Sequence, residues 1–298
     1  ELQEIRKEVD LLRRELAALK QHEEPLIDEQ TALVRRRHQR KREYKNVGDE
    51  VEAWAERILL EDCDNDESWT EVPCNKMMRS RDNRDGQTRT YIKWMKDSRS
   101  DSAQDDGPEW PCLRIYSTIQ APCDEVCLYL SQEKHMPDYN CLLDKYRDLE
   151  EITSTSKICW AQTPQILFVK PRDFITFCSF RWRHDGTQVV VNQAVDKYEN
   201  LEANAYAYRG ATFISPDPED PERTRISLLT HSSPGDEVPI WACRTAMKTL
   251  LPTEPYRLFH KIQEGVLNSR AQLQATLQER TELVANRTQN RPAGLAQM

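Results

Sequence analysis

Nine strand-like segments joined by short turns, and one long amphipathic helix after them, leave few folds open to this chain. Three of the segments precede a short helix that begins near Pro122, and six follow it. Strands that succeed one another across short turns pair antiparallel. The last helix, from Val238 to about Leu273, must bury its apolar side, and the concave face of such a sheet is the only large surface available. The sequence therefore predicts an α+β fold in which a curved antiparallel sheet of about nine strands wraps around a long C-terminal helix.

The strand segments are recognised by apolar residues that alternate with polar ones, and by turn signals between them. They cover residues 69–78, 88–95, 113–119, 145–153, 156–162, 174–183, 187–196, 204–215 and 223–231. Asn83 to Gly86 and Asp185-Gly186 are the clearest turns. A helix over 49–60 precedes the strands. The C-terminal helix should be interrupted at Pro252 and Pro255, and the polar residues after about 275 should fray.

The chain begins with an apolar seam whose residues are alternately three and four positions apart. This is the spacing of the a and d positions of a coiled coil. The seam consists of Leu2, Ile5, Val9, Leu12, Leu16 and Leu19, and Pro25 ends the helix. An isolated helix of this length is marginal in water, so it needs a partner. The partner is either a second copy of the chain, in a homodimer, or the chain's own domain if the helix folds back.

A basic segment follows the seam. Residues 35–45 contain seven Lys or Arg against Glu43 alone. The segment is a solvated helix face or linker, a nuclear import signal, or a contact with anionic lipid. Residues 46–298 carry 30 basic against 40 acidic residues, which argues against nucleic acid as the ligand of the main domain.

The sequence lacks the motifs of several common classes of protein. The nine cysteines are odd in number and show no Cys-x-x-Cys spacing, so free thiols in a reducing cytosol and no metal site are expected. No stretch of 18 apolar residues and no signal peptide is visible, which favours a cytoplasmic protein, with the basic segment leaving the nucleus open. The chain starts at Glu1 and is compatible with a fragment. No nucleophile elbow, P-loop, zinc-hydrolase or dinucleotide motif occurs, so we predict a non-enzymatic protein without a cofactor.

Four segments in register resemble START domains (steroidogenic acute regulatory protein-related lipid transfer). Lys-Pro-Arg-Asp-Phe at 170–174 resembles the family's Pro-Arg-Asp-Phe motif. Tyr-Arg-Gly-Ala at 208–211, followed by Ile-Ser-Pro at 214–216, resembles its Arg-Ala strand and Pro turn. Residues 234–241 resemble the approach to its last helix, and 119–130 its strand-to-helix step. The resemblance covers roughly residues 48–272.

The resemblance implies a helix-grip fold that holds one lipid between the sheet and the last helix, for lipid transfer or lipid sensing, with transient contact at a membrane. Together with the seam and the basic segment, it divides the chain into a coiled-coil helix (1–24), a basic linker or helix (25–47), a START-like domain (48–272) and a polar tail (273–298). Two alternatives stay open. One is a lipid-responsive regulatory or transcription-associated protein that dimerises through its coiled coil. The other is a scaffold whose cavity has filled.

The candidate ligand contacts come from both strand alternation and the resemblance. Arg209 is the preferred head-group contact, because a guanidinium binds phosphate or carboxylate bidentately. Arg172 and Asp173 either form a structural ion pair or contact the head group. One of two alternating sets faces the lipid, and periodicity does not choose between them: Phe174, Thr176, Cys178 and Phe180, or Ile175, Phe177, Ser179 and Arg181. The further candidates, for lipid wall or for plain core, are Tyr139, Trp160, Tyr206, Tyr208, Phe213, Trp241 and Phe259.

The chain also departs from the family pattern. Tyr139-Asn140 stands where the family usually has Trp-Asp. In sterol-binding relatives a buried Glu and Arg lie on neighbouring strands, and the corresponding positions here are Cys159 and Cys178. This departure argues against a sterol ligand. Pro252, Pro255 and Gly265 are expected hinge or kink points for opening the last helix.

Overall fold

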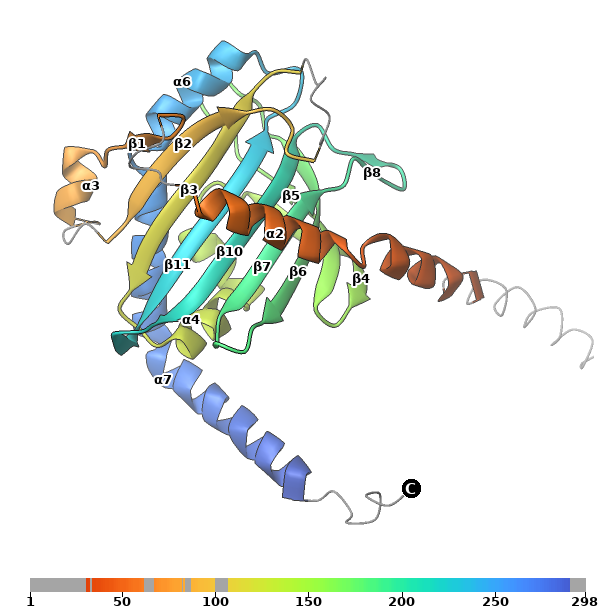
Figure 1. Cartoon of the computed structure of the whole chain (residues 1–298), viewed down its shortest axis with the longest axis vertical. Coiled ribbons are helices and arrows are strands. Elements are labelled where there is room, and N and C mark those ends of the chain that lie inside the picture. The colour runs from red at the N-terminus through yellow and green to blue at the C-terminus, as the bar shows by residue number, and fades with distance from the viewer. Residues whose placement is uncertain are drawn as a thin grey trace, which may run out of the picture. The chain divides into compact units, whose positions relative to one another are not determined.

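The alternating segments form one nine-stranded antiparallel sheet in a computed structural model, which describes residues 31–32, 34–61, 67–81, 83, 87–99 and 107–289. The strand order is β1-β2-β3-β11-β10-β7-β6-β5-β4 (Figure 1). The strands are β1 (Thr70–Val72), β2 (Arg89–Met95), β3 (Trp110–Ile119), β4 (Lys145–Thr153), β5 (Ser156–Gln162), β6 (Asp173–Trp182), β7 (Gln188–Ala194), β10 (Tyr206–Asp217) and β11 (Asp220–Ser233). A separate small hairpin joins β8 (Lys197–Tyr198) to β9 (Leu201–Glu202).

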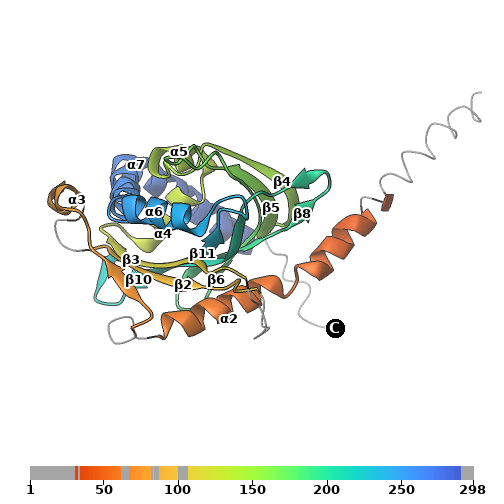
Figure 2. The ribbon, with the colours of Figure 1, turned by 90° about the horizontal axis from the view of Figure 1, so that it is seen from above.

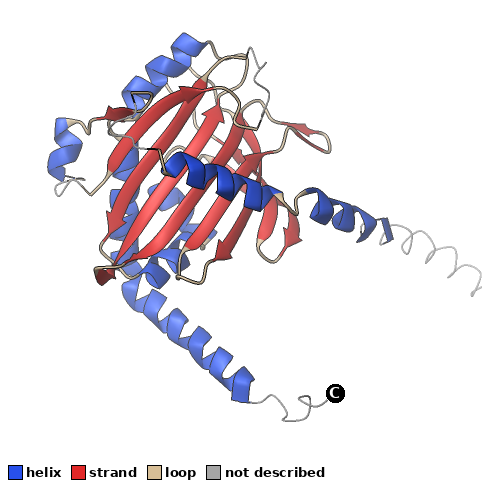
Figure 3. Cartoon of the chain, viewed as in Figure 1, coloured by secondary structure: helices blue, strands red, loops and turns tan. Residues whose placement is uncertain are grey.

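The helices form two layers on opposite faces of the sheet. Helix α2 (Val47–Leu59) lies across one face, and the other helices of the grip cover the opposite face (Figure 2). Figure 3 shows the same layers by secondary structure. The grip contains α4 (Cys123–Leu130), the short 3-10 turn η1 (Glu133–His135), α5 (Met136–Tyr139), α6 (Ile240–Leu250) and α7 (Glu254–Gln289). The predicted fold class is confirmed: a curved sheet of nine strands holds a long C-terminal helix.

The chain divides into two units, residues 1–47 and residues 48–298. In the first unit residues 34–43 are helical, and Arg40 lies 3.4 Å from Glu43 within that helix. The predicted coiled-coil segment, 1–24, falls outside the described residues and stays a prediction. No helix in the described ranges is both long and apolar enough to cross a membrane.

Helix α2 is attached to the sheet by a buried arginine. Arg114 of β3 donates hydrogen bonds to the backbone carbonyls of Ile58 (3.2 Å), Leu59 (2.6 Å) and Glu61 (2.8 Å). The last carbonyls of a helix have no partner within it, and a cation at that end also complements the helix dipole. Arg114 therefore fixes the end of α2 against β3, the third strand of the sheet.

The first predicted strand, 69–78, is wrong over most of its length. Strand β1 covers only Thr70–Val72, and the helix α3 (Lys76–Arg81) follows it. Pro73 cannot donate to a sheet, and the side chain of Asn75 accepts a hydrogen bond from the Met78 amide at 2.7 Å. Asn75 is thus an N-cap, and it turns the chain into a helix. The turn predicted at 83–86 falls mostly outside the described residues.

The break in the C-terminal helix is confirmed, whereas its predicted end is wrong. Helix α6 ends at Leu250 and α7 begins at Glu254, with Pro255 in its first turn, where a missing amide costs no hydrogen bond. The carbonyl of Pro252, inside the break, accepts a hydrogen bond from the Asn75 amide at 3.0 Å. Helix α7 continues to Gln289, well past 273, because good helix formers continue without Gly or Pro up to Pro292.

Gly265 is not a break in α7 but a point of close approach. A Cβ atom at Gly265 would lie 2.0 Å from the hydroxyl of Tyr129 on α4, and Tyr129 is itself 1% exposed. The absence of a side chain lets α7 lie directly on the Tyr129 ring. The predicted kink at this residue is therefore replaced by a packing role.

We expect Gly265→Ala to lower the free energy of unfolding by about 1–3 kcal/mol, because overpacking outweighs a helix-propensity gain of about 1 kcal/mol. Chemical denaturation measures this difference. Gly48→Ala is the matched control, since its added Cβ meets only Val191 at 3.8 Å, in ordinary van der Waals contact. Equal stability of wild type and Gly265→Ala would show that α7 shifts away from Tyr129 at no cost.

Candidate functional site

Ion pairs to α2 determine which side of β6 faces which helix layer. Arg181 forms ion pairs with Asp49 and Glu52 of α2. Alternate side chains of a strand share a face. The set that includes Arg181 therefore faces α2: Ile175, Phe177, Ser179 and Arg181. The opposite set lies on the other side of the sheet, the side of α6 and α7, where Phe180 is 42% exposed: Phe174, Thr176, Cys178 and Phe180.

The register extends these two faces across the sheet. Cys178 pairs with Asn192, and Asn192 pairs with Gly210. Further along the same face of β10, Ile214 packs in a core cluster with Phe259 and other residues of α7. We call this side of the sheet the α7 face, and the side under α2 the α2 face.

The two faces differ in how completely they are covered. On the α2 face these side chains near the middle of the sheet are fully buried: Ile158 is 0% exposed, Ile175 1% and Val189 1%. On the α7 face the side chains in the middle of the sheet remain half-buried although helices lie over this side. These half-buried residues are Cys178, Val190, Asn192, Thr212 and Leu228. The helices therefore fill the α7 face less tightly than α2 fills the opposite one.

Helix α7 is held near its middle by an ion-pair cluster. Arg270 lies 3.2 Å from the carboxylate of Glu125 on α4 and 2.6 Å from that of Glu222 near the start of β11. Gln274 also donates to Glu125 at 2.8 Å. Glu125 is buried, so the pairing is little screened by water. The near end of α7 follows the break at 251–253.

A tight turn beside α6 exposes apolar side chains. Ile166 and Val169 bond each other's backbone at 3.0 and 2.8 Å, so Leu167 and Phe168 form the tip of a two-residue turn. Leu167 has φ 54°, a conformation in which Asn or Gly is usual and a branched residue is strained. Phe168 lies against Trp241 of α6, with ring centroids 5.6 Å apart. Both rings are mainly in solvent, Phe168 at 52% and Trp241 at 65% exposure.

Several predicted contacts lie on the α2 face. Arg209 pairs with Gln193 and donates to its side chain at 3.3 Å, and Phe177 lies on the other side of Gln193. Phe213 lies 5.2 Å from the guanidinium of Arg183, which is bound by carboxylates of α2. Trp160 pairs with Ile175, a residue of the same face. The structure thus separates Arg209, Phe177, Phe213 and Trp160 from the set that faces α7.

Arg172 and Asp173 have different partners. Arg172 is buried and lies 3.1 Å from the carboxylate of Glu237, in the loop before α6. Asp173 accepts a hydrogen bond from Gln162 at 3.0 Å. The Nε atom of Arg172 is buried and has no hydrogen-bond partner among the described residues. Arg172 therefore joins the 163–172 loop to the loop before α6 and keeps an unused donor there.

The remaining predicted residues lie around the two ends of the grip. Phe259 is buried in the cluster of α4 and α7, and Tyr139 packs at its edge, 6.1 Å from the Tyr129 ring. Tyr208 packs with Ala242 and Cys243 of α6, and Tyr206 packs against that cluster.

Two thiols meet on the α7 face. The Sγ atoms of Cys159 on β5 and Cys178 on β6 are 3.4 Å apart. The sequence indicated these positions only as substitutes for a Glu and an Arg, because spacing along the chain gives no distance between two strands. Their contact is a result of the β5–β6 register, in which Cys159 pairs with Thr176.

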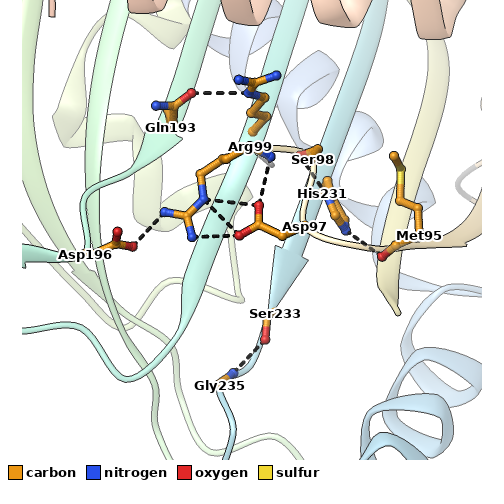
Figure 4. A network of polar contacts seen from close by, with 10 residues as sticks. Met95, Asp97, Ser98, Arg99, Gln193, Asp196, His231, Ser233 and Gly235 are labelled. Atoms are coloured by element: carbon orange, nitrogen blue, oxygen red, sulfur yellow. Dashed lines mark hydrogen bonds and ion pairs between the residues drawn. The ribbon is translucent and has the colours of Figure 1, made fainter. Parts of the chain in front are cut away.

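The sequence also missed a polar network after β2 (Figure 4). Arg99 forms ion pairs with Asp97 (2.8 Å) and Asp196 (2.6 Å). The ring of His231 on β11 contacts Ser98 Oγ at 2.9 Å and the Met95 carbonyl at 3.2 Å. Burial lowers the pKa of His231 from 6.5 to about 4, so this imidazole is neutral near pH 7. The network fixes the loop to the sheet.

Comparison with solved structures identifies the fold. The chain is similar to human StAR-related lipid transfer protein 5, at 15% identity and a TM-score of 0.55 over 76% of this chain and 99% of that one. It is also similar to human STARD10, at 14% identity and a TM-score of 0.53 over 75% and 82% of the two chains. No family model and no curated protein matches the sequence. The domain has the helix-grip fold of the START domains, as the four motifs predicted.

Proposed function

We propose that the domain binds one lipid between the α7 face of the sheet and helices α6 and α7, for lipid transfer or lipid sensing. The observation that carries this proposal is the incomplete cover of the α7 face, where Cys178, Val190 and Thr212 remain half-buried under helices. The similar human protein is named for lipid transfer, which favours the same role here. The protein then holds its ligand without acting on it as an enzyme, in the cytoplasm or the nucleus.

A closed site is what the physics of a carried lipid requires. Exposing an acyl chain of about 16 carbons to water costs about 13 kcal/mol, at about 0.8 kcal/mol for each CH₂. A curved sheet closed by a long helix avoids this cost only if the side chains between them leave a cavity for the acyl chain. Arg172 is the proposed head-group contact, since its Nε is an unused donor beside α6. A phosphate or carboxylate is the matching group.

The test is native mass spectrometry of the purified protein, with extraction and identification of lipid from the same sample. One lipid per protein supports the proposal and gives the ligand class. A protein that carries no lipid and takes up no labelled phospholipid, sterol or fatty acid from vesicles would contradict it. That result would favour the alternative of a scaffold whose interior has filled.

The same proposal gives the exposed turn a role as the membrane contact. The strained turn at Leu167 exposes the side chains of Leu167 and Phe168 to solvent. They lie beside α6, where Trp241 and Ile240 are also exposed, Ile240 to 38%. Exposed clusters of this kind mark interaction surfaces. Docking of the turn in a bilayer would place α6 at the membrane when it moves aside to admit a lipid.

We expect Phe168→Asp to weaken binding to lipid vesicles at least about tenfold, because a buried Phe contributes about 1.5–3 kcal/mol. Vesicle sedimentation measures the binding, and lipid uptake from vesicles measures its consequence. Leu60→Asp is the matched control, an apolar residue with 85% exposure at the end of α2, on the opposite face of the sheet. Equal loss in both variants would mean that added negative charge, and not the turn, determines the effect.

A further inference from the structure

The contact between Cys159 and Cys178 differs from an ordinary pair of packed thiols. The two residues lie on neighbouring strands, with Cys159 opposite Thr176 and Cys178 opposite Lys157. Their Sγ atoms are 3.4 Å apart, and a disulfide requires about 2.05 Å. Diagonal neighbours on one face of an antiparallel pair are about 7–8 Å apart, so two short side chains meet there only when they point toward each other. A disulfide needs Cα atoms about 4.4–6.8 Å apart, so the two strands must also draw together locally for the sulfurs to bond.

A second thiol pair in the chain provides a contrast. Cys123 and Cys127 of α4 have Sγ atoms 3.8 Å apart. They are four residues apart on one helix, where Cβ atoms lie about 5–6 Å from each other, and a disulfide needs about 3.5–4.5 Å. Bridging Cys123 to Cys127 would distort α4. The cross-strand sulfurs are also closer to each other, at 3.4 Å, than the two sulfurs of α4.

The surroundings of Cys159 also favour its ionised form. A hydrogen bond from the Cys178 thiol lowers the pKa of Cys159, and this outweighs the opposing effect of burial. The ammonium of Lys157, next but one along β5, acts in the same direction. The hydrogen bond to Cys159 and burial raise the pKa of Cys178 instead. One sulfur is thus the better nucleophile and the other is held as its protonated partner.

We propose that Cys159 and Cys178 are a thiol pair in the wall of the lipid site that hydroperoxides convert into a disulfide. The route to the sulfurs rests on the proposed function, because Cys159 is 4% exposed and Cys178 is half-buried on the α7 face. The hydroperoxide is either dissolved or carried on an oxidised acyl chain that occupies the site. In both cases the reacting group is the same O–O bond.

The reaction balances without another reagent. The Cys159 thiolate attacks the outer oxygen of the hydroperoxide; an S–O bond forms, the O–O bond breaks, and the alcohol leaves with the proton that Cys159 released. The sulfur of Cys178 then attacks the sulfenic acid on Cys159. An S–S bond forms, the S–O bond breaks, and water leaves with the Cys178 proton. The electron pair that the two thiols lose reduces the hydroperoxide.

The experiment treats the full chain with hydrogen peroxide in one arm and a long-chain fatty acid hydroperoxide in the other. Peptide mapping under non-reducing conditions detects a peptide that links Cys159 to Cys178. Cys159→Ser and Cys178→Ser should each abolish the link, while Cys141→Ser, which removes an exposed thiol, should leave it unchanged. Faster reaction with the fatty acid hydroperoxide identifies the carried lipid as the source, and faster reaction with hydrogen peroxide identifies the dissolved one.

Loading the protein with a saturated fatty acid tests the position of the pair. At a free concentration of about ten times Kd, the rate with hydrogen peroxide should fall about tenfold, in proportion to the empty fraction. Oxidation of Cys141 without any Cys159–Cys178 link would overturn the proposal, and so would a link that forms equally fast with fatty acid bound. A protein that forms the link but takes up no lipid would defeat the proposed function and support the thiol chemistry alone.

Discussion

Replacing Thr212 by aspartate is expected to weaken lipid binding at least about a hundredfold. Thr212 is half-buried on the α7 face of β10, between Val190 and Leu228. A carboxylate there would lose its water when an acyl chain covers it, at a cost of several kcal/mol, and about 2.7 kcal/mol already corresponds to a hundredfold. Titration with a fluorescent fatty acid measures the affinity, and circular dichroism shows whether the fold is retained.

The control for this variant uses the same strand. Ser215 is three residues further along β10 and therefore on the α2 face, opposite Arg225 of β11. Ser215→Asp adds the same charge at a comparable exposure, so it should bind lipid as the wild type does. If Thr212→Asp folds and retains full affinity, the lipid does not lie against the α7 face, and the proposed site is wrong.

The stability of the domain is expected to fall by about 3 kcal/mol as the pH is lowered from 6.5 to about 4, through His231 alone. Burial lowers the pKa of this imidazole to about 4 in the folded chain, against 6.5 without burial. Between these two values the unfolded chain binds a proton that the folded chain does not, so acid favours unfolding. Each pH unit corresponds to about 1.4 kcal/mol. The destabilisation caused by His231 is absent above pH 6.5 and reaches its full value below about pH 4.

Denaturation curves of wild type and His231→Gln across this pH range isolate the contribution from that of the carboxylates. The difference in unfolding free energy between the two proteins should change by about 3 kcal/mol across the window. His184→Gln, at an exposed position in the β6–β7 turn, serves as the control and should follow the wild type. Parallel curves for wild type and His231→Gln would mean that the buried ring accepts a proton without leaving its contacts to Ser98 and Met95.

The order of elements was predictable from the sequence because it depends on local signals. Alternation and turn residues placed the strands of the nine-stranded sheet from β2 onward within a few residues, but not the small β8–β9 hairpin, and Pro252 with Pro255 indicated the break between α6 and α7. The same signals failed at 69–78, where Pro73 and the Asn75 cap override the apolar pattern. They also ended α7 too early, since the polar residues after 275 include many Gln, Glu, Arg, Leu and Ala and no Gly or Pro before Pro292.

The sequence predicted which strands surround the candidate site, but not which of their side chains face it. Its position between the sheet and the last helix followed from the order of elements and from four motifs, and the START fold confirms that architecture. The preferred head-group contact, Arg209, lies on the α2 face beside Gln193, whereas Arg172 lies beside α6 with a donor unused. A strand has a period of two, so its sequence gives two equivalent faces and no means to assign the inner one.

The sequence by itself determined the strands, their antiparallel order and the long closing helix, because alternation, turns and prolines act over a few residues. Tertiary structure alone decided which face is inner, through ion pairs of Arg181 to Asp49 and Glu52, residues far away in the chain. It also decided the close approach of Gly265 to Tyr129 and the contact of Cys159 with Cys178. These features depend on register and on packing between distant segments, and distance along the chain does not encode either one.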